Sequence, residues 1–420
     1  MDLPRRFRKL SVRERRAILA ESLKSSDGNA FGSETEFIEL ADIMVESAVG
    51  YLPLPVGIAT GFLIDNENYA IPMATEEPSV IAAASFAAAT VARAGGFITT
   101  PGRPITIGQV HVGGVGPEAA AAVIRGRARL EDAASEPLAR MTKRGGGLRE
   151  IRATWLEATE TLRVEFEVDV QAAMGANLVN TVAERLRPIV EELTGGEVIM
   201  AILSNAAPAR IANASFALPV EALARAGRTG AEIANRIVTA TKIADADPHR
   251  AVTHNKGIMN GLTALALATG NDTRALEAAV HSHAASTGSY RSLTSYEVRK
   301  NALCGSIALP VVLASVGGAA GVHPTARAGL ELLGGPSHDR LASIAVSLGL
   351  AQNLAALWAL VSEGIQTGHM GLHANRLAWM AGARGSERAA VVDLMKNRSE
   401  FSSQAAEQAL REIRGGAREQ

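Results

Sequence analysis

Residues 104–204 carry the pattern that most limits what this chain can fold into. The strict alternation of apolar and polar residues in TLRVEFEVDV (161–170) predicts a β-strand with one buried face. Strand-like and helical segments alternate around it: PITIGQVHVGG (104–114), a helical run from Pro117, LREIRATWLEA (148–158), a helix kinked at Pro188, and GEVIMAILSN (196–205). The order β-α-β-β-α-β is that of ferredoxin-like folds, so we expect an α+β protein with this subdomain inserted in a larger domain.

The rest of the chain is predicted to be mainly helical. Residues 340–366 are apolar on nearly every side, which is typical of a helix buried at the centre of a domain. The uncharged segment 302–322 is long enough to cross a membrane, but Pro310 and the glycines at 317 and 318 would interrupt such a helix, so we expect a buried strand and a turn. The predicted limits are 1–103 and 205–365 for a large domain with a buried central helix, 104–204 for the inserted domain and 366–420 for a C-terminal helical element.

Composition excludes several classes of protein. A chain of 420 residues is too long for one ordinary core, and its net charge of −1 does not favour binding to nucleic acid or an anionic membrane. The single cysteine, Cys304, excludes an internal disulfide and is typical of a reducing compartment. Because no apolar segment follows the basic N-terminal residues, we predict no secretory signal and expect a cytoplasmic protein.

Lys256 is the first candidate for chemistry. It stands in THNKGIMNGLTALALATGND (253–272), a segment of small and apolar residues that ends in Asp272. A buried, unpaired ammonium is costly, so the lysine must be paired, exposed or used in catalysis. The alternative is that Lys256 and Asp272 form an ion pair that only stabilises the fold, with no part in catalysis.

Three further segments are candidates, and each also has a plainer explanation. Glu76 and Glu77 precede a predicted helix, where the helix dipole favours negative charge in any case. Gly175 opens a helix after a strand, so nearby N–H groups are suited to a phosphate, or the glycine only permits close packing. His369 and His373 share a helix face, but without a nearby cysteine or carboxylate, proton transfer is favoured over a metal site.

Six segments in collinear order resemble hydroxymethylglutaryl-CoA reductases. They are VESAVGYLPLPVGIATGF (45–62), MATEEPSVIAAAS (73–85), AAMGANLVNT (172–181), HRAVTHNKGIMNG (249–261), ATGND (268–272) and EGIQTGHMGLHAN (363–375). The resemblance runs from about residue 7 to the C-terminus. The chain resembles the class II, bacterial-type enzymes of this family in its length, and like them it is not expected to carry a membrane anchor.

This resemblance implies that hydroxymethylglutaryl-CoA and mevalonate plus CoA are interconverted with two NADPH or NADH and no metal. The intermediates are mevaldyl-CoA and mevaldehyde. Lys256 would stabilise the oxyanion, with Asp272 keeping it charged and oriented. Glu77 would pass a proton to the aldehyde oxygen, and His369 would protonate the departing CoA thiolate.

The resemblance also assigns binding residues. Those implied for the substrate are Ser79, Arg250, Asn260, Arg8 and His373, the last as a neighbour that orients His369. Those implied for the cofactor are Met174, Gly175, Ala176, Asn177 and Asn205. Two positions depart from the family pattern: Ala172 replaces the usual Asp before AMG, and Ser47 lies in ESAVG where ENVIG is common.

Cofactor preference is predicted from the segment before the glycines at 145–147. The resemblance implies an acidic residue there in NAD-specific family members, and an ungapped count puts Leu138 at that position. Arg140, Lys143 and Arg144 stand nearby and are suited to a 2′-phosphate, so NADPH is favoured over NADH.

The family architecture further implies dimers or hexamers (trimers of dimers) with active sites shared between subunits, and a mobile C-terminal flap that carries His369. The alternative is a catalytically silent homologue that binds CoA or nucleotide in a regulatory role. A thiolase or acyltransferase would need a nucleophilic cysteine, for which Cys304 in its apolar run is a poor candidate. The residues do not determine whether mevalonate is made for isoprenoid biosynthesis or degraded.

Overall fold

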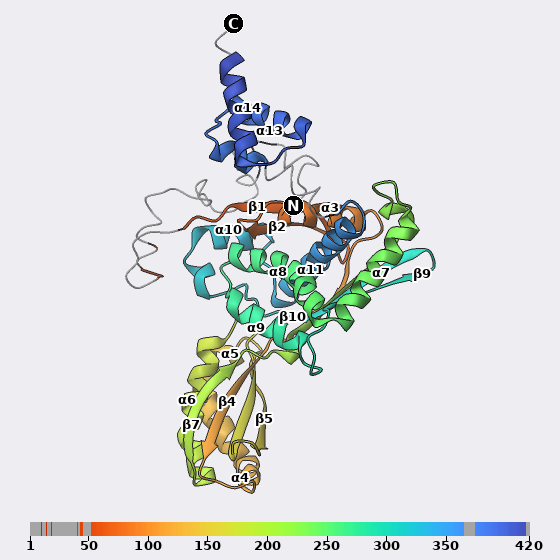
Figure 1. Ribbon diagram of the computed structural model, residues 1–420. Coiled ribbons are helices and arrows are strands. Elements are labelled where there is room, and N and C mark those ends of the chain that lie inside the picture. The colour runs from red at the N-terminus through yellow and green to blue at the C-terminus, as the bar shows by residue number, and fades with distance from the viewer. Residues whose placement is uncertain are drawn as a thin grey trace.

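The structure, a computed structural model, describes residues 52–364 and 374–416, together with positions 10, 14, 18, 40, 43 and 44. This described part contains three large hydrophobic cores. The three regions that hold them are arranged in a row in Figure 1. The largest lies in the middle, one lies beneath a four-stranded sheet at one end, and one joins the C-terminal helices at the other. The domain limits at 103, 204 and 365 stay predictions. The separate cores account for the changes in hydrophobic periodicity along the sequence.

The inserted region has the predicted β-α-β-β-α-β order. Its elements are β4 (Ile105–Gly113), α4 (Ala119–Arg125), α5 (Arg127–Thr142), β5 (Gly147–Leu156), β6 (Thr161–Asp169), α6 (Ala176–Thr194) and β7 (Glu197–Ser204). The strands lie in the order β5-β6-β4-β7 with neighbours antiparallel, which is the ferredoxin-like arrangement. On β6 the apolar residues are buried, and Phe166 packs on Gly108, where a Cβ would lie 2.1 Å from its ring. The predicted fold class is confirmed.

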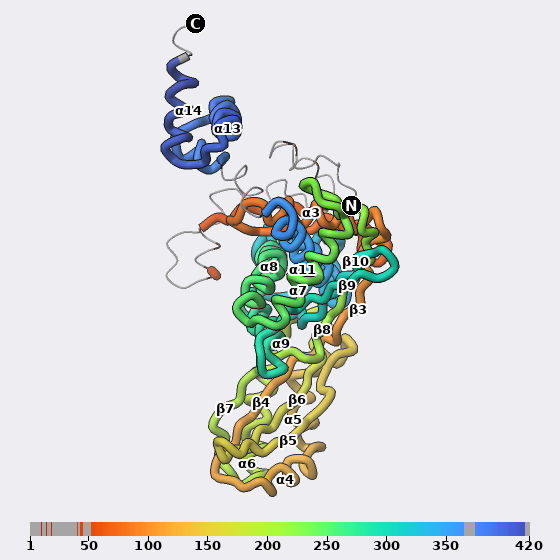
Figure 2. Tube along the Cα trace, turned by 45° about the vertical axis from the view of Figure 1, so that its right-hand side comes forward, coloured from red at the N-terminus to blue at the C-terminus, as the bar shows by residue number. Residues whose placement is uncertain are grey.

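Helix α11 (His338–Val361) forms the centre of the largest core. The elements packed around it are α3 (Val80–Ala92), α7 (Gly230–Ala246), α8 (Pro248–Ala268), β8 (Ile211–Pro219) and β10 (Ala302–Pro310). Figure 2 shows α11 among the three helices. Within the described ranges it is the only helix long and apolar enough to cross a membrane, and 78% of its most apolar window is buried inside the protein. The core therefore accounts for its composition.

The large core also contains strands that the sequence did not reveal. A hairpin joins β1 (Val56–Ile64) to β2 (Glu67–Ala74), and a sheet has the order β3-β8-β10-β9, with β3 spanning Ile98–Thr100 and β9 spanning Thr294–Arg299. Of these, only β10 was expected, together with the turn after it, where Gly317 and Gly318 have positive φ. The buried residues of β8 include two alanines, Ala212 and Ala214, which have a low preference for strands and hide its alternation.

The remaining helices complete both ends of this arrangement. Alongside the large core lie α9 (Thr273–Ala284), α10 (Pro324–Leu332) and the short 3₁₀ helices η2 (Pro208–Arg210), η3 (Val220–Leu223) and η4 (Gly318–Gly321). The C-terminal helices α13 (Ser386–Arg398) and α14 (Ser403–Gly416) pack on each other around a core that includes Val391, Met395 and Ala409. A separate C-terminal element was expected from the charged, amphipathic sequence.

Two stretches of chain connect the large core to the inserted region, before β4 and after β7. They are bonded to each other, because the Arg103 N–H donates to the Ala209 carbonyl at 2.8 Å. Gly102 lies so close to Arg210 that a Cβ would be 2.4 Å from the Arg210 carbonyl carbon. The junction is therefore a tight crossing of two segments of the chain.

His254 on α8 is a buried titratable group beside this core. The residue is 2% exposed, and Nε2 lies 2.6 Å from Thr294 Oγ1 and 3.1 Å from Asn353 Nδ2. Burial lowers the pKa of His254 to about 4, and the charge of Arg250 adds to the effect. The unfolded chain binds a proton there near pH 6.5, so protonation favours unfolding.

We predict that the stabilisation from neutral His254 is complete above pH 6.5 and is lost as the pH falls towards 4. The full loss is about 3 kcal/mol of unfolding free energy, because the pKa of His254 is about 4 in the folded chain and 6.5 in the unfolded one. Urea titrations of the wild type and His254→Gln between pH 7.5 and 5 measure it, and the variant should show the flatter dependence. His249→Gln, at an exposed position of the same helix, serves as control. Parallel slopes in wild type and His254→Gln would contradict the prediction.

Candidate active site

The structure brings together two predicted catalytic residues that are far apart in the sequence. Lys256 projects from α8, and its Nζ donates to Glu77 Oε2 at 3.1 Å. Glu77 lies in the turn between β2 and α3, where its backbone N–H donates to Thr75 Oγ1 at 3.2 Å. Both elements contact α8, so the core fixes the positions of the two backbones. The lysine is therefore paired, as expected, but with Glu77.

Ser79 precedes α3 in an unusual conformation. A serine at this position normally has extended φ and ψ and caps the helix with its hydroxyl. Here Ser79 has φ 75°, in the left-handed region, and makes no side-chain cap hydrogen bond. A non-glycine residue held there costs on the order of 1 kcal/mol, and such strain is common at functional sites. The strained residue lies two positions after Glu77, in the same turn.

Two more predicted residues lie on α8 itself. Asn260 follows Lys256 by four residues, so both side chains lie on one face of the helix. Arg250 lies in the first turn of the same helix and is half-buried. On either side of Lys256 along α8, Val252 and Leu267 are exposed. The face that carries the lysine is thus partly apolar and uncovered in a single chain.

Asp272 does not pair with Lys256 within the chain, and its expected place beside Lys256 stays a prediction. Its carboxylate caps α9, accepting from the N–H groups of Arg274 at 2.9 Å and Ala275 at 3.2 Å. Lys256 stands far from the C-terminal end of α8, about 18 Å along the axis at the rise of an α-helix. Closeness in the sequence suggested a pair that the rigid helix prevents.

The Lys256–Glu77 pair is open to water in one chain. The lysine side chain is 60% exposed and the glutamate 37%. Ion pairs at such exposure contribute little to stability, so folding energy does not account for the two residues. An ammonium that stabilises a developing oxyanion needs a site from which water is excluded. A single chain therefore supplies the two charged groups but does not exclude water from them.

The residues expected to bind the cofactor gather at the start of α6. Gly175 is the N-cap, with φ 85°, and a Cβ there would lie 2.3 Å from Val170 Cγ1, so only glycine fits. A glycine cap has no side chain to occupy the first N–H groups of the helix, which leaves them suited to an anionic group. Met174, Ala176 and Asn205 line one narrow cavity of about 20 Å³ beside this turn. The donor set fits a phosphate-bearing cofactor.

A second loop lies next to this turn. Gly147 pairs with Asp169 at the end of β6, and Arg149 donates to Asp169 Oδ2 at 2.9 Å. The loop of glycines at 145–147 and the loop before α6 therefore meet at one edge of the sheet. Arg140, Lys143 and Arg144 are all exposed near it, at the end of α5.

Leu138 does not face the cofactor turn, and the expectation that this position reads the ribose was wrong. Leu138 is 2% exposed and belongs to the hydrophobic core of the inserted region. An acidic residue at that position of α5 would be buried and could not face a cofactor. The ungapped count therefore does not identify the position that reads the ribose. Ala172 is half-buried, and its carbonyl accepts a hydrogen bond of 3.0 Å from the Ser315 N–H of the large core.

Some predicted residues fall outside the described ranges. They are Arg8, Ser47, His369 and His373. Within the described residues, no group of three or more His, Cys, Asp or Glu could hold a metal ion.

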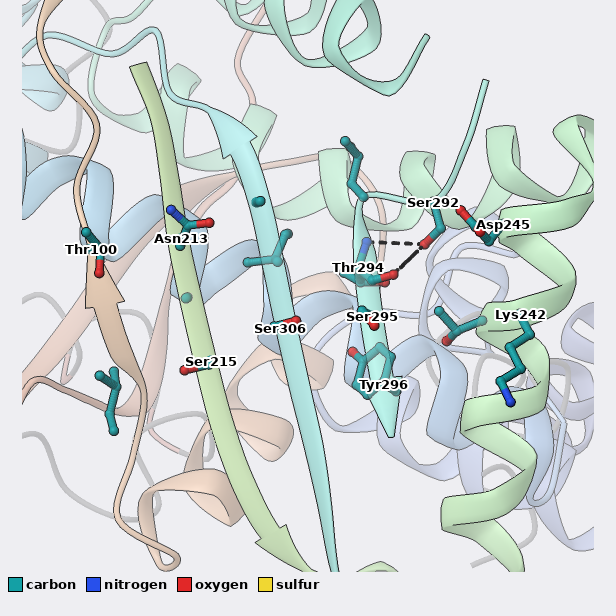
Figure 3. A pocket seen from close by; sticks show the side chains of 16 residues that line it. Thr100, Asn213, Ser215, Lys242, Asp245, Ser292, Thr294, Ser295, Tyr296 and Ser306 are labelled. Atoms are coloured by element: carbon teal, nitrogen blue, oxygen red, sulfur yellow. Dashed lines mark hydrogen bonds between the residues drawn. The ribbon is translucent and has the colours of Figure 1, made fainter. Parts of the chain in front are cut away.

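Another hollow lies away from all these residues. It has a volume of about 480 Å³ and lies against the sheet β3-β8-β10-β9 and helix α7. Figure 3 shows its polar lining, which includes Asn213, Ser215, Lys242 and Ser306. None of the predicted site residues contributes to it, so we place the candidate site at the Lys256–Glu77 pair and the α6 turn.

Comparison with known proteins supports the same assignment. The family model described as hydroxymethylglutaryl-coenzyme A reductase matches residues 11–374. A 3-hydroxy-3-methylglutaryl-coenzyme A reductase from Archaeoglobus fulgidus is 44% identical over 97% of this chain and 94% of its own length. A reductase of the same name from Streptococcus pneumoniae has a solved structure that matches with a TM-score of 0.81 and 40% identity, covering 97% of this chain and 99% of that one.

A second solved structure concerns the cofactor. It is the class II enzyme from Streptococcus pneumoniae bound to NADPH in open conformations, with a TM-score of 0.80 and 40% identity, covering 85% of this chain and 99% of that chain. The family match spans most of the sequence and contains Lys256, Glu77 and the α6 turn. This chain therefore belongs to the hydroxymethylglutaryl-coenzyme A reductase family of NAD(P)H-dependent oxidoreductases.

Proposed function

We propose that this chain interconverts hydroxymethylglutaryl-CoA and mevalonate plus CoA. In the reductive direction one thioester, two NAD(P)H and two protons give one alcohol, free CoA and two oxidised cofactors, through mevaldyl-CoA and mevaldehyde. When bound, the nicotinamide cofactor supplies the hydrides. The observation that carries the proposal is the Lys256–Glu77 pair, a cation and a proton donor or acceptor held 3.1 Å apart on separate elements of one core.

Lys256 and Glu77 act on the same oxygen atom in this proposal. As the thioester carbonyl is reduced, negative charge develops on its oxygen, and the Lys256 ammonium stabilises it. In the second reduction, the Glu77 carboxyl gives a proton to the oxygen of mevaldehyde, which becomes the hydroxyl of mevalonate. Their hydrogen bond holds the two groups side by side, so that either can reach an oxygen bound between them.

The remaining groups bind the substrate and release CoA. Arg250 and Ser79 bind the carboxylate end of the hydroxymethylglutaryl group, and Asn260 lines the site beside Lys256. Arg8 binds CoA. His369 protonates the departing thiolate, with His373 as its neighbour. The C–S bond of mevaldyl-CoA breaks at this step, and the thiolate takes the proton.

We further propose that Asp272 acts in the active site of a second copy of the chain, in a dimer or a hexamer built from dimers. Three observations support a shared site. Within one chain Asp272 lies beyond the far end of α8 from Lys256. The pair of Lys256 with Glu77 is open to water. The α8 face around it carries exposed Val252 and Leu267, which a partner would cover.

The same residues serve both directions, so mevalonate synthesis and mevalonate degradation are equally compatible with this site. A catalytically silent homologue that binds CoA or nucleotide in a regulatory role is the alternative. The paired Lys256 and Glu77 favour the enzyme. Both side chains are exposed, so their ion pair contributes little to folding and does not by itself explain their presence. No described contact favours a regulatory role.

Lys256→Ala is predicted to lower kcat by about a hundredfold or more, since it removes the group that stabilises the oxyanion. The unfolding free energy should change by no more than about 1 kcal/mol, because the ion pair is exposed. Steady-state kinetics and urea unfolding measure the two effects. Lys242→Ala, at an exposed position on α7, should leave both unchanged. A Lys256→Ala variant with near-normal turnover would refute the proposed role.

Mixing two inactive variants tests whether the site is shared. Lys256→Ala and Asp272→Asn subunits should regain activity on exchange, because a mixed dimer has one site with both native residues. At equal amounts, random pairing gives about a quarter of wild-type activity. Light scattering checks that the oligomer exchanges and stays intact. If each site lies within one chain, no mixture regains activity.

For the cofactor, we predict that kcat/KM with NADPH is at least as high as with NADH. The exposed guanidinium and ammonium groups of Arg140, Lys143 and Arg144 are suited to a 2′-phosphate. Replacing each with Ala should lower kcat/KM for NADPH and leave that for NADH unchanged. Arg125→Ala, an exposed change on α4, is the control. A strong wild-type preference for NADH that these variants do not alter would show that the basic residues face elsewhere.

A further inference from the structure

Arg210 is a buried cation at the junction between the large core and the inserted region. It ends η2, just before β8, and is 1% exposed. Among the ion pairs of the described chain, none involves Arg210, and its buried Nη1 has no hydrogen-bond partner there. Burial lowers the pKa of Arg210 to about 10, an effect that Asp169 partly opposes, so the guanidinium stays charged at neutral pH.

A charge in this position is costly. A buried guanidinium without a carboxylate loses its hydration and regains only part of it through hydrogen bonds to neutral groups. A buried apolar side chain of similar size often stabilises a fold as well or better. The contacts that Arg210 makes should therefore show what the charge is for.

The hydrogen bonds of its side chain all go to the inserted region, although Arg210 itself lies directly before β8 of the large sheet. Nε donates to the Ile105 carbonyl at 2.9 Å, and Nη2 donates to Thr106 Oγ1 at 2.8 Å and to the Met174 carbonyl at 3.3 Å. Thr106 Oγ1 also donates to the Met174 carbonyl, at 3.0 Å. Two donors thus hold one carbonyl, and that carbonyl belongs to the turn before α6.

The held carbonyl determines where the next N–H points. The peptide bond is planar and trans, so the Met174 C=O and the Gly175 N–H point in opposite directions. With the carbonyl held towards Arg210, the Gly175 N–H is directed away from the buried guanidinium. Gly175 is the N-cap of α6, and no side chain caps that helix from this position. Arg210 therefore fixes the orientation of a peptide at the site where a phosphate-bearing cofactor fits.

The same turn is also attached to the large core just before Met174. The Ser315 N–H donates to the Ala172 carbonyl at 3.0 Å, and Ala173 forms a parallel bridge with Val316. The turn is thus held at Ala172, Ala173 and Met174 by residues outside the inserted region. This arrangement ties the shape of the cofactor turn to the position of the large core.

We propose that Arg210 is a positioning residue for the nicotinamide-cofactor site, acting through the Met174 carbonyl on the peptide that begins α6. The inference rests on the proposed function, because it assumes that this turn receives the cofactor. Arg210 does not touch the reacting atoms, so its loss acts on cofactor binding. Substrate affinity, which depends on α8 and the α3 turn, is not affected.

The test uses the full chain with Arg210→Met, which keeps much of the side-chain volume and removes the charge. Calorimetric titration gives the Kd of NADPH and of hydroxymethylglutaryl-CoA, and thermal unfolding gives Tm. We expect the Kd of NADPH to rise about tenfold or more, as for loss of a hydrogen bond from a charged donor. The Kd of hydroxymethylglutaryl-CoA should be unchanged. Arg210→Lys, which keeps the charge but loses the forked geometry, should be intermediate.

Two more variants separate positioning from general structure. Thr106→Val removes the second donor to the Met174 carbonyl and one acceptor of Arg210 Nη2, but it keeps the charge of Arg210. It should weaken NADPH binding in the same direction by a smaller factor. Arg187→Met removes a donor to the Val198 carbonyl elsewhere in the inserted region, and should leave NADPH binding unchanged. If Arg210→Met does not fold, Thr106→Val decides the matter by itself.

Several results would overturn the inference. Equal weakening of both ligands, or a lower Tm with NADPH affinity intact, would mean that Arg210 only holds the fold together. An effect of Arg187→Met equal to that of Arg210→Met would mean the same. A wild type that binds NADPH while Thr106→Val and Arg210→Met bind it equally well would refute this inference alone. A wild type that binds neither NADPH nor NADH would refute the proposed function and this inference with it.

Discussion

The need to cover α11 on every side governs the rest of the large core. A helix that is apolar all round cannot leave a face to water, so helices and a sheet must surround it. Glycines allow the closest of these contacts: Gly261 of α8 lies against Leu348, and Gly349 of α11 lies against Ile258. Because α3 and α8 both pack on α11, the turn that carries Glu77 comes within hydrogen-bonding distance of Lys256. The proposed catalytic pair is in this sense a consequence of burying one helix.

The two halves of the proposed site depend on different kinds of stabilisation. The Lys256–Glu77 pair lies on the large core and is exposed, so its geometry comes from the backbones beneath it. The turn before α6 belongs to a region with its own hydrophobic core. That turn is joined to the large core by the contacts of Arg210 and Ser315. A reaction that needs substrate and cofactor together requires such a link, since each part has its own hydrophobic core.

Backbone strain and exposure to water occur together at the Lys256–Glu77 pair. Ser79 has a left-handed conformation beside Glu77, and the face of α8 that carries Lys256 has exposed apolar residues. A second copy covering this face would exclude water from Lys256 and bury Val252 and Leu267 at the same time. The cost of the open surface in one chain would then be offset by assembly.

The sequence by itself determined the features that depend on local periodicity and on motif. The alternation in residues 161–170 predicted β6, the unbroken apolar run predicted α11, and the motifs around Lys256 and Glu77 indicated the family. These features are visible because they repeat within a few residues or recur as long, ordered segments.

Only the tertiary structure decided which side chains meet. Lys256 pairs with Glu77 across 179 positions of sequence, while Asp272, sixteen residues away, is kept apart by the rigid length of α8. Leu138 lies close to the glycine loop in sequence, but the phase of α5 turns it into the core. Arg210 gave no signal at all, because an arginine in a short alanine-rich segment is expected to be exposed, and only the contact between the large core and the inserted region buries it. Periodicity is a local property, whereas pairing depends on helix direction and burial, which the whole chain sets together.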